Sequence, residues 1–418
     1  MAKICMLVSE DHTTHPIIRR QVPTLIAAGH EVSVLDPCDP APGRMSRYRR
    51  TRVHPVNLQL VGKVVWIFLR RVNERVLGEP WWTVIYFAQM FLTSLRYAGA
   101  AFAEGADYYH AHDMQTFLAA IIVGRLKRRS VIYDAHELQS EEGSPTALPN
   151  RVMRVIERRL VPLADHLIVP NVSRAKVYAS RCALRAEPTV ILNCPPMAEV
   201  SRTNVIRERL GLSPATRVVL YHGTFMPGRA LEELMRAARA FAPDIVLVMI
   251  GRQNRFYEDV LRPLHTLEEL DNKVFFVPYV HPDEVLSYVA AADLGVVIYK
   301  SIDLNNYLCA PTKLYEYLMA GVPVAVCNFP EMRALLDEFP VGVSFDPDNP
   351  ESISHSVNDF FSLPMDRLAG IQRSVASARQ WFTWEVEGQK LLSLYAAPKA
   401  EACPWKGAAA AGPSGRDD

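Results

Sequence analysis

Short apolar segments alternate with helical patterns along most of this 418-residue chain. Residues 3–9 suit a buried strand, a helical pattern follows and ends at Gly29, and residues 31–35 suit a second strand. A strand, a helix and a second strand within about 35 residues form a βαβ unit with parallel strands and a right-handed crossover. This alternation restricts the chain to α/β folds built on parallel sheets.

The alternation occurs in two series. In the first, further strands are expected at residues 107–110, 130–133, 166–169 and 189–192, before the run Asn193 to Pro196 interrupts the pattern. In the second, strands are expected at residues 218–222, 245–250, 274–277, 294–298, 322–326 and 342–345. Since the chain is too long for one core, we predict two Rossmann-like, doubly wound α/β domains that face each other across a cleft.

Breaks in the pattern give the expected domain boundaries. We expect an N-terminal domain over residues 1–196, a linker over 197–216, a C-terminal domain over 217–382, a terminal helix over 383–397 and a tail over 398–418. The tail is rich in Ala, Gly and Pro, has no apolar period and is expected to be disordered. Because ligands of doubly wound sheets bind at the carboxyl ends of the strands, we expect the functional site in the cleft.

Charge and cysteine usage limit the partners and the compartment. The chain has 46 Lys and Arg residues and 45 Asp and Glu residues, which argues against nucleic acid as a partner. Its seven cysteines are scattered, as expected in a reducing compartment. The N-terminus reads as a strand rather than a secretion signal, and the longest apolar stretch, residues 81–103, is interrupted by Gln89 and Arg96. We therefore expect a cytoplasmic protein without a membrane-spanning helix.

An insertion over residues 40–82 interrupts the first series. It is rich in Pro and Arg, and residues 61–76 form an amphipathic helical pattern with Lys and Arg beside its apolar face. Trp66, Trp81 and Trp82 add aromatic side chains. Two interpretations remain open. The insertion binds an anionic membrane surface, which would make the protein peripheral on the inner face of the membrane, or its helix packs on the sheet in the ordinary way.

The stretch from Ala310 to Cys327 contains a candidate anion site. We expect Thr312 and Lys313 at the start of a short helix, where free N–H groups and the helix dipole attract anions. Glu316 is expected in the first turn of this helix. A carboxylate does not bind phosphate, but it accepts hydrogen bonds from hydroxyls such as those of a ribose. If Thr312 is the N-cap, the capping-box position is Tyr315, so capping does not explain Glu316.

A second candidate is the loop from His222 to Arg229, which joins a strand to a helix. Gly223 permits close approach of the backbone to a ligand, and Arg229 can bind phosphate with two hydrogen bonds. Since Arg229 and Lys313 follow two strands of one sheet, we expect both cations to converge on one diphosphate. The alternative is an ordinary turn with a surface arginine. Arg252, at a third strand end, is a further candidate.

Polar side chains also follow two strands of the first domain. We expect a polar cleft wall for an acceptor, because hydroxyl-rich ligands need convergent hydrogen-bonding groups. His110 and His112 lie two positions apart on a strand, and we expect only one of them to face the cleft. A zinc site is an alternative without CxxC or HExxH support, so we predict no metal; loop capping is the alternative for Asp134 and His136. The acceptor-side candidates are His110, Asp113, Asp134, His136 and Glu137.

Taken together, these residues resemble the family-four retaining glycosyltransferases, the glycosyl transferases group 1 with the GT-B fold. The resemblance covers about residues 3–396 and is strongest in the second domain. The motifs that carry it are 311–317, 320–324, 292–295 and 329–331 in the second domain, and 110–113, 133–137, 164–166, Asn193 with Pro195 and Trp384 with Glu385 in the rest of the chain. The combination is more specific than any single motif.

The resemblance implies roles for single residues. Glu316 would hold the ribose, Arg229 and Lys313 the diphosphate, and residues near Val280 the base. His112 would meet the donor sugar near the reacting carbon and is the catalytic candidate. The terminal helix would cross back onto the first domain. The donor-binding candidates are Arg229, Lys313, Glu316, Thr312, Gly223, Thr224, Arg252, Val280 and Leu314.

The reaction that the resemblance implies is transfer of a sugar from a UDP- or GDP-linked donor to a glycan or lipid-linked acceptor, with retention and without a metal or other cofactor. Three departures leave the donor sugar open. Leu308 stands where a sugar-binding glutamate often lies, Thr224 stands where an arginine often follows the glycine, and the loop 9–15 lacks a glycine pair. A nucleotide-sugar epimerase and a non-catalytic nucleotide-sugar-binding protein are the alternatives.

Overall fold

The computed structural model describes residues 1–9, 16–38, 49–58, 74–141, 144, 146–281 and 284–396. In the N-terminal domain, seven parallel strands form a sheet in the order β3-β2-β1-β4-β5-β6-β7. These strands are β1 (Lys3–Leu7), β2 (Glu31–Asp36), β3 (Arg49–Arg52), β4 (Tyr108–His112), β5 (Ser130–Asp134), β6 (His166–Val169) and β7 (Thr189–Val190). The order reverses between β1 and β4, where doubly wound sheets bind ligands.

The C-terminal domain repeats this arrangement. Its six parallel strands lie in the order β10-β9-β8-β11-β12-β13. They are β8 (Arg217–His222), β9 (Ile245–Ile250), β10 (Val274–Val277), β11 (Leu294–Val297), β12 (Val324–Cys327) and β13 (Gly342–Phe345). The two doubly wound parallel sheets confirm the predicted fold class.

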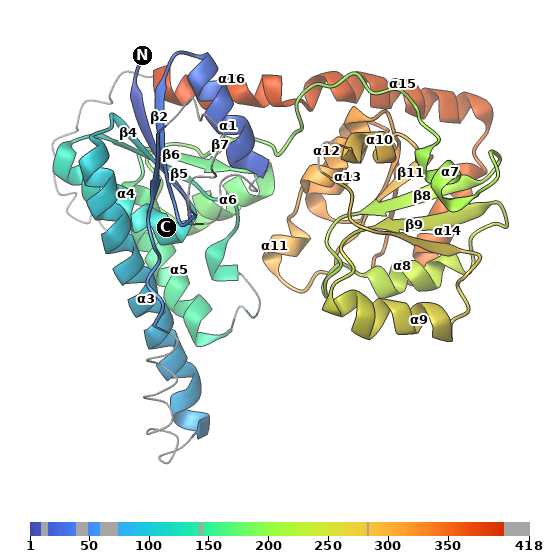
Figure 1. The fold of residues 1–418 in the computed structure, drawn as a ribbon, viewed down its shortest axis with the longest axis horizontal. Helices are drawn as coiled ribbons and strands as arrows, with labels where there is room; N and C mark the ends of the chain where they lie inside the picture. The colour runs from blue at the N-terminus through green and yellow to red at the C-terminus, as the bar shows by residue number, and fades with distance from the viewer. Residues whose placement is uncertain are drawn as a thin grey trace, which may run out of the picture.

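Helices cover both sheets, and two of them join the domains (Figure 1). The helices of the N-terminal domain are α1 (Pro16–Ala27), α3 (Glu74–Glu104), α4 (Met114–Lys127), α5 (Leu148–Leu160) and α6 (Val172–Arg181). Those that follow are α7 (Val205–Leu210), α8 (Leu231–Ala238), α9 (Arg262–Leu267), α10 (Val285–Val289), α11 (Leu304–Tyr307), α12 (Thr312–Met319), α13 (Pro330–Glu338), α14 (Pro350–Phe361), α15 (Met365–Trp381) and α16 (Trp384–Ala396).

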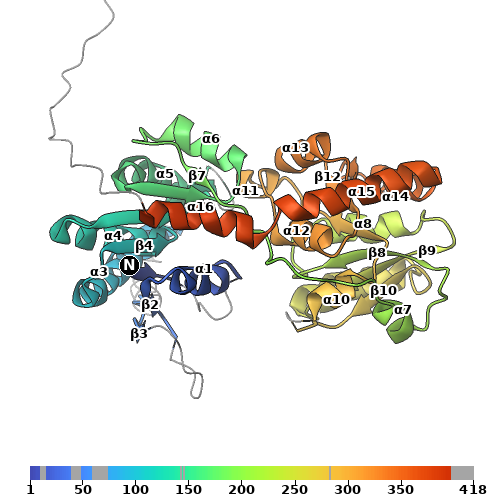
Figure 2. The ribbon, with the colours of Figure 1, turned by 90° about the horizontal axis from the view of Figure 1, so that it is seen from above.

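Helix α16 returns from the C-terminal domain to the N-terminal one. Figure 2 shows α15 beside the C-terminal sheet and α16 beside the N-terminal sheet. Trp384, Leu391 and Leu394 are buried with residues of β1 and β2, and the Trp384 indole N–H donates to the Thr24 hydroxyl at 2.7 Å. The end of the N-terminal domain, just before the linker, meets the start of α16, where the Trp384 N–H donates to the Pro195 carbonyl at 2.8 Å. The chain therefore crosses between the domains at one side of the cleft.

Strand β3 is absent from the predicted elements, because its sequence, Arg-Arg-Thr-Arg, has no apolar residue. It lies at the sheet edge beside β2, and the Arg50 guanidinium pairs with the buried Asp36 carboxylate at 2.7 Å. These arginines, part of the predicted membrane-binding insertion, thus belong to the sheet. Most of the predicted 61–76 helix lies outside the described residues, as do the tail 398–418 and most of the loop 9–15.

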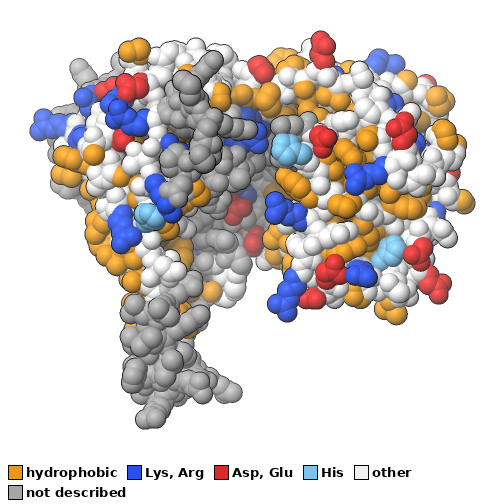
Figure 3. All heavy atoms as spheres, viewed as in Figure 1, with side chains coloured by type: hydrophobic (Ala, Val, Ile, Leu, Met, Phe, Trp, Pro, Cys, Tyr) orange, Lys and Arg blue, Asp and Glu red, His pale blue; other side chains and the backbone are white. Residues whose placement is uncertain are grey.

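Helix α3 begins at Glu74 and projects below the N-terminal domain (Figure 1). Tyr97 and Ala101 on its inner side are buried in the core beside α4. In Figure 3, hydrophobic side chains with Lys and Arg beside them line the outer edge of this domain. In the described ranges, no helix is both long and apolar enough to cross a membrane. The exposed apolar residues of α3 include Trp82, Val84, Tyr86, Phe91, Leu92, Leu95 and Phe102.

Candidate functional site

Helix α12 carries the predicted anion site. Pro311 takes the N-cap position and Thr312 is the first helical residue, so the condition under which Tyr315 would be the capping-box position does not hold. No acidic residue lies in the first turn, which places Glu316 one turn further along than expected. Gly321, with φ of 74°, ends the helix in a conformation that glycine adopts without strain. The helix is therefore fixed at both ends by residues with a suitable backbone conformation.

A tyrosine holds α12 against the sheet. The Tyr317 hydroxyl donates to the Leu220 carbonyl of β8 at 2.7 Å. Its ring lies against Gly295 of β11, where an added Cβ would come within 2.2 Å of the ring. This explains the glycine in the motif 292–295: it lets the helix approach the strand closely enough for Lys313 and Glu316 to reach the strand ends.

Arg229 and Lys313 meet over one aromatic ring. The Arg229 guanidinium lies 4.0 Å from the centre of the Tyr299 ring, and Lys313 Nζ lies 5.5 Å from the same centre. Lys313 Nζ also lies 4.3 Å from the ring centre of Tyr221. Gly223 makes room for this ammonium, because a Cβ there would stand 2.9 Å from Nζ, and its φ of 138° also favours glycine. Two cations from two strand ends thus share one site.

The electrostatics of this site favour an anion. Burial, with the charge of Arg229, lowers the pKa of Lys313 to about 7 although Glu316 opposes the shift. Burial raises the pKa of Glu316, while Arg20 and Lys313 lower it. Burial and the charge of Lys313 lower the pKa of His222 to about 3, so this ring is neutral where it lies 3.6 Å from the Glu316 carboxylate. A bound anion would relieve the repulsion between the two cations.

These residues open into a cavity of about 570 Å³ between the domains. Of the predicted site residues, eight line it, namely Gly223, Thr224, Arg229, Thr312, Lys313 and Glu316 of the C-terminal domain and His136 and Glu137 of the N-terminal domain. The cavity is large enough for a small ligand held by both domains.

A smaller pocket of about 170 Å³ adjoins it and shares His222, Gly223 and Thr224 with it. Arg252 and Val280 line this pocket, and the Arg252 guanidinium lies 4.9 Å from the centre of the Tyr279 ring. Leu314, by contrast, is buried in the hydrophobic core of the C-terminal domain. The candidates therefore divide between the cavity, the adjoining pocket and the core.

The N-terminal wall of the cavity is backed by a cluster of three histidines around Asp134. The rings of His110 and His112 stack with centroids 4.4 Å apart, so the expectation that only one of them takes this side was wrong. Residues two apart on a strand share a face. Asp134 Oδ2 lies 3.7 Å from His110 Nε2 and from His112 Nδ1, and His112 Nδ1 lies 3.0 Å from His136 Nε2. Only His136 of these lines the cavity.

Charge is balanced inside this cluster. Burial would raise the pKa of Asp134, but the facing histidines hold it well below its usual range. Burial would lower the pKa of His136, but the charges of Asp113 and Asp134 raise it to about 9. Asp113 has an unusual backbone φ of 64° for a residue other than glycine. The cluster is thus a buried, mutually compensated set of charges.

His110, His112 and Asp134 offer ligand atoms that all lie within 4.8 Å of one another, so they are the residues that could hold a metal. Two observations fit this poorly. The two stacked rings are nearly parallel, at 20°, which does not aim two ring nitrogens at one tetrahedral ion. In addition, Asp134 Oδ2 already accepts a hydrogen bond from Gln21 at 2.7 Å. The absence of a metal stays a prediction.

Two motif aspartates lie at the opposite ends of the sheets from the cavity. Asp165, just before β6, accepts from the Val131 N–H at 2.8 Å. Asp293, just before β11, accepts from the Val218 N–H at 2.7 Å. Each bridges two neighbouring strands at their amino ends. The motif of Asp293 is one of those that carry the resemblance, and its aspartate side chain supports the sheet.

Four residues that line the cavity or contact its surroundings were not among the candidates predicted from the sequence, namely Arg20, Asn171, Arg174 and Asn305. Arg20 donates to the Asn193 carbonyl at 3.3 Å and contributes to the electrostatics of Glu316. Asn171 and Arg174 begin α6 directly after β6, so the strand-end rule that identified the other candidates would have found them. Arg20 and Asn305 lie away from predicted strand ends and had no such signal.

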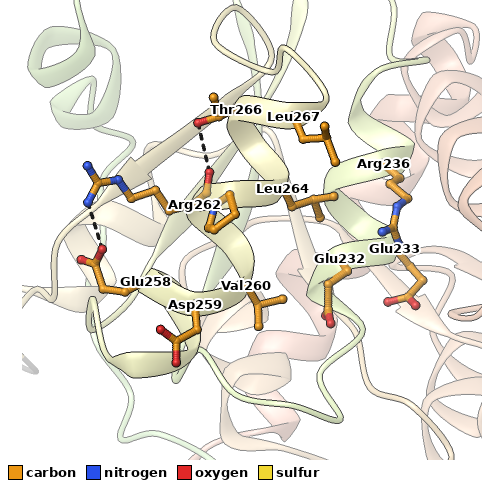
Figure 4. Close-up of a pocket in the computed structure, with 11 residues that line it drawn as sticks. Glu232, Glu233, Arg236, Glu258, Asp259, Val260, Arg262, Leu264, Thr266 and Leu267 are labelled. Carbon is orange, nitrogen blue, oxygen red and sulfur yellow. Dashed lines mark hydrogen bonds and ion pairs between the residues drawn. The ribbon is translucent and has the colours of Figure 1, made fainter.

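A larger groove, of about 870 Å³, lies elsewhere, on the outer side of the C-terminal domain between α8 and α9 (Figure 4). Its lining charges pair with neighbours on the surface: Arg262 Nη1 lies 2.9 Å from Glu258 Oε2, and Arg236 Nε lies 3.1 Å from Glu268 Oε1. It shares no residue with the cavity between the domains. We therefore place the functional site in the cavity and not in this groove.

Models of known protein families match both halves of the chain. The family model "Glycosyl transferases group 1" matches residues 203–374, and "Glycosyl transferase 4-like domain" matches residues 14–193. Similar curated proteins include D-inositol 3-phosphate glycosyltransferases from Salinispora tropica, 26% identical over 65% of this chain, and from Mycolicibacterium gilvum, 27% identical over 51%. The matches span 60% and 47% of the length of these relatives.

Solved structures share the fold over nearly the whole chain. HepE from Anabaena, solved with UDP and glucose, superimposes with a TM-score of 0.69 at 15% identity, covering 95% of this chain and all of HepE. Sucrose-phosphate synthase from Thermosynechococcus elongatus superimposes with a TM-score of 0.70 at 18% identity, covering 94% of this chain and 98% of that structure. With glycosyltransferase models matching residues 14–193 and 203–374 and the GT-B fold throughout, the chain belongs to a glycosyltransferase family with the GT-B fold.

Proposed function

We propose that this chain transfers a sugar from a UDP- or GDP-linked donor to a glycan or lipid-linked acceptor, with retention of the anomeric configuration and without a metal. The observation that carries the proposal is the pair of cations, Arg229 and Lys313, over the Tyr299 ring at the start of α12. Two cations beside a helix N-terminus suit a diphosphate. The HepE structures with UDP and with UDP-glucose support this donor class.

The cations explain how the reaction would be accelerated. Breaking the bond between the sugar and the diphosphate leaves negative charge on the diphosphate oxygens. Arg229, Lys313 and the N-terminus of α12 are already oriented towards that charge, so they stabilise it without reorganisation. Contact between the two domains excludes water and limits hydrolysis of the donor.

The remaining residues would fix the donor. Glu316 accepts hydrogen bonds from the ribose hydroxyls, and the pocket of Arg252 and Val280 takes the base. We propose that His112 and His136 act together at the donor sugar. His112 is buried and lies 3.0 Å behind His136, which faces the cavity, so His136 is the group that would make the contact.

A donor screen tests the proposal. The purified protein is incubated with radiolabelled UDP- and GDP-sugars and with three acceptors, a lipid extract, a glycan mixture and D-inositol 3-phosphate, which the names of the relatives suggest. Label on an acceptor supports transfer, a changed donor sugar would indicate an epimerase, and binding alone would indicate a non-catalytic protein. The anomeric configuration of the product tests retention, and undiminished transfer with a chelator tests the absence of a metal.

We also propose that the protein is cytoplasmic and binds an anionic membrane surface through α3. The exposed residues Trp82, Tyr86 and Phe91 suit the interface region of a bilayer, where aromatic side chains are favoured. Vesicles with anionic lipid should retain the protein at low salt, and a Trp82→Ser and Phe91→Ser double variant should be retained less. Equal loss of both proteins to the supernatant would contradict the proposal.

A further inference from the structure

Helix α11 belongs to the C-terminal domain by sequence but is seated in the N-terminal one. Leu308, directly after α11, is 6% exposed and is part of the hydrophobic core that contains Tyr133 and Tyr178. Leu304 packs against the same core. Leu308 is not among the residues that line the cavity, so its side chain does not face the donor site.

Hydrogen bonds hold this helix in place. The Asn305 side chain makes two bonds with one residue of the N-terminal domain: it accepts from the Leu138 N–H at 2.8 Å and donates to the Leu138 carbonyl at 3.0 Å. Asn171 donates to the Leu308 carbonyl at 2.7 Å, and Arg174 donates to the Asn305 carbonyl at 3.2 Å. Asn171, Arg174 and Asn305 are all buried, so losing one of these bonds is costly.

The same contacts reach the cavity wall. Arg174 also donates to the His136 carbonyl, and the Tyr178 hydroxyl donates to the Glu137 carbonyl at 3.3 Å. Residues 136–138 are therefore held by α11 at one end and by α6 along the rest. His136 and Glu137 in this segment line the cavity, which ties the docking of α11 to the position of the cavity wall.

A neighbouring hydrogen bond also joins the two domains. The Glu331 carboxylate, from α13 of the C-terminal domain, accepts from the Ser173 N–H at 2.6 Å in the first turn of α6. The carboxylate thus meets the positive end of a helix dipole. The two domains are joined here by a contact that involves neither the linker nor α16.

We propose that α11 is a latch between the domains, and that Asn305 and Leu308 are positioning residues for His136. When α11 is docked, the segment 136–138 is fixed against the nucleotide site; when α11 is undocked, the domains separate and His136 loses its place. The role of His136 at the donor rests on the proposed function, whereas the latch itself rests on the contacts. Leu308 closes the enzyme and does not contact the sugar.

The first test is Leu308→Glu, with Leu267→Glu as the matched control at an exposed position outside the cavity. Burying a carboxylate in the N-terminal core should undock α11 and increase the radius of gyration in X-ray scattering. The affinity for UDP or GDP should change less than about threefold, because Arg229, Lys313 and Glu316 lie in the C-terminal domain and not in the core that the substitution disturbs. Turnover should fall about 10²-fold, because His136 is misplaced. The control should match the wild type. A Leu308→Glu variant that stays compact, or that turns over faster, would overturn the latch.

The second test does not depend on the activity or on a drastic substitution. Asn305→Ala removes both bonds to Leu138 and should speed hydrogen exchange at the Leu138 amide, with little change at the amide of Leu220, in the core of the other domain. Unchanged exchange at Leu138 would refute the latch. If no nucleotide sugar serves as a donor while hydrogen exchange and X-ray scattering change as expected, the proposed function is contradicted and the latch is supported.

Discussion

The two walls of the cavity lie at the carboxyl ends of the strands in two domains of the same architecture. They differ in whether their charged side chains have partners of opposite charge. On the N-terminal wall, Asp134 is surrounded by histidines that compensate it, and the group is buried. On the C-terminal wall, Arg229 and Lys313 lie over aromatic rings, and within the described part of the chain neither forms an ion pair. The first wall is electrically complete, while on the second the two cations outnumber the one carboxylate, Glu316.

This difference indicates what each wall is for. A buried charge with its own partners holds a structure in one arrangement, because losing a partner is costly. Two close cations without an acidic partner destabilise the free protein slightly and gain when an anion binds. We therefore expect changes on the N-terminal wall to lower stability and changes on the C-terminal wall to lower activity.

The largest effect should come from breaking the N-terminal wall. Asp134→Asn leaves the histidines without their carboxylate, and the free energy of unfolding should fall by about 3–5 kcal/mol. Urea denaturation measures this. Asp107→Asn is the control, because Asp107 is half-exposed and its loss should cost no more than about 1 kcal/mol. Equal effects of the two substitutions would remove the distinction between the walls.

The next largest effect should come from the C-terminal wall. Arg229→Ala should lower turnover about 10²–10³-fold, equivalent to about 2.7–4 kcal/mol of barrier, since it removes one donor to the developing charge. The free energy of unfolding should stay the same or rise, because the repulsion with Lys313 is relieved. Arg236→Ala, at an exposed position of α8, is the control and should change neither quantity. Unchanged turnover in Arg229→Ala would remove it from the site.

The walls should also differ in how they respond to pH. His136 has a raised pKa of about 9, so its stabilisation is complete below about pH 6.5 and is lost as the pH rises through 9, on the order of 3 kcal/mol in all. Lys313 has a lowered pKa of about 7, so the unfolded chain binds more protons above pH 7 and stability rises with pH there.

Substitutions separate these opposing contributions. Unfolding is measured from pH 6 to 10 for the wild type, His136→Gln and Lys313→Met. The stability difference between wild type and His136→Gln should shrink above pH 6.5. Above pH 7, the free energy of unfolding of the wild type should rise relative to that of Lys313→Met. If the stability difference between wild type and variant changed with pH in the same direction for both variants, the two walls would not differ in charge compensation.

Much of the C-terminal wall could be predicted from the sequence, and little of the latch. The strand-end rule needs only the order of apolar segments, and it led to Arg229, Lys313 and Glu316. The N-terminal wall depends on which side chains share a face, where the expectation for His110 and His112 failed. The pair Asn305 and Leu138 is separated by 167 positions, and no local pattern links such residues. β3 was missed because an edge strand of arginines has no apolar pattern.

The smallest effect should come from Glu316, which carries a negative charge on the cationic wall. If it served only to offset Lys313, Glu316→Ala would strengthen the binding of UDP. If it accepts hydrogen bonds from the ribose, the substitution should weaken UDP binding by about 1.5–3 kcal/mol. The 2′-deoxy and 3′-deoxy analogues of UDP separate these effects on the ligand side. At least one analogue should bind the wild type more weakly than UDP does, and this difference should vanish in Glu316→Ala, as titration calorimetry can measure. If the variant still bound UDP more tightly than the deoxy analogues, Glu316 would serve only to offset the charge of Lys313, and other residues of the wall would bind the ribose.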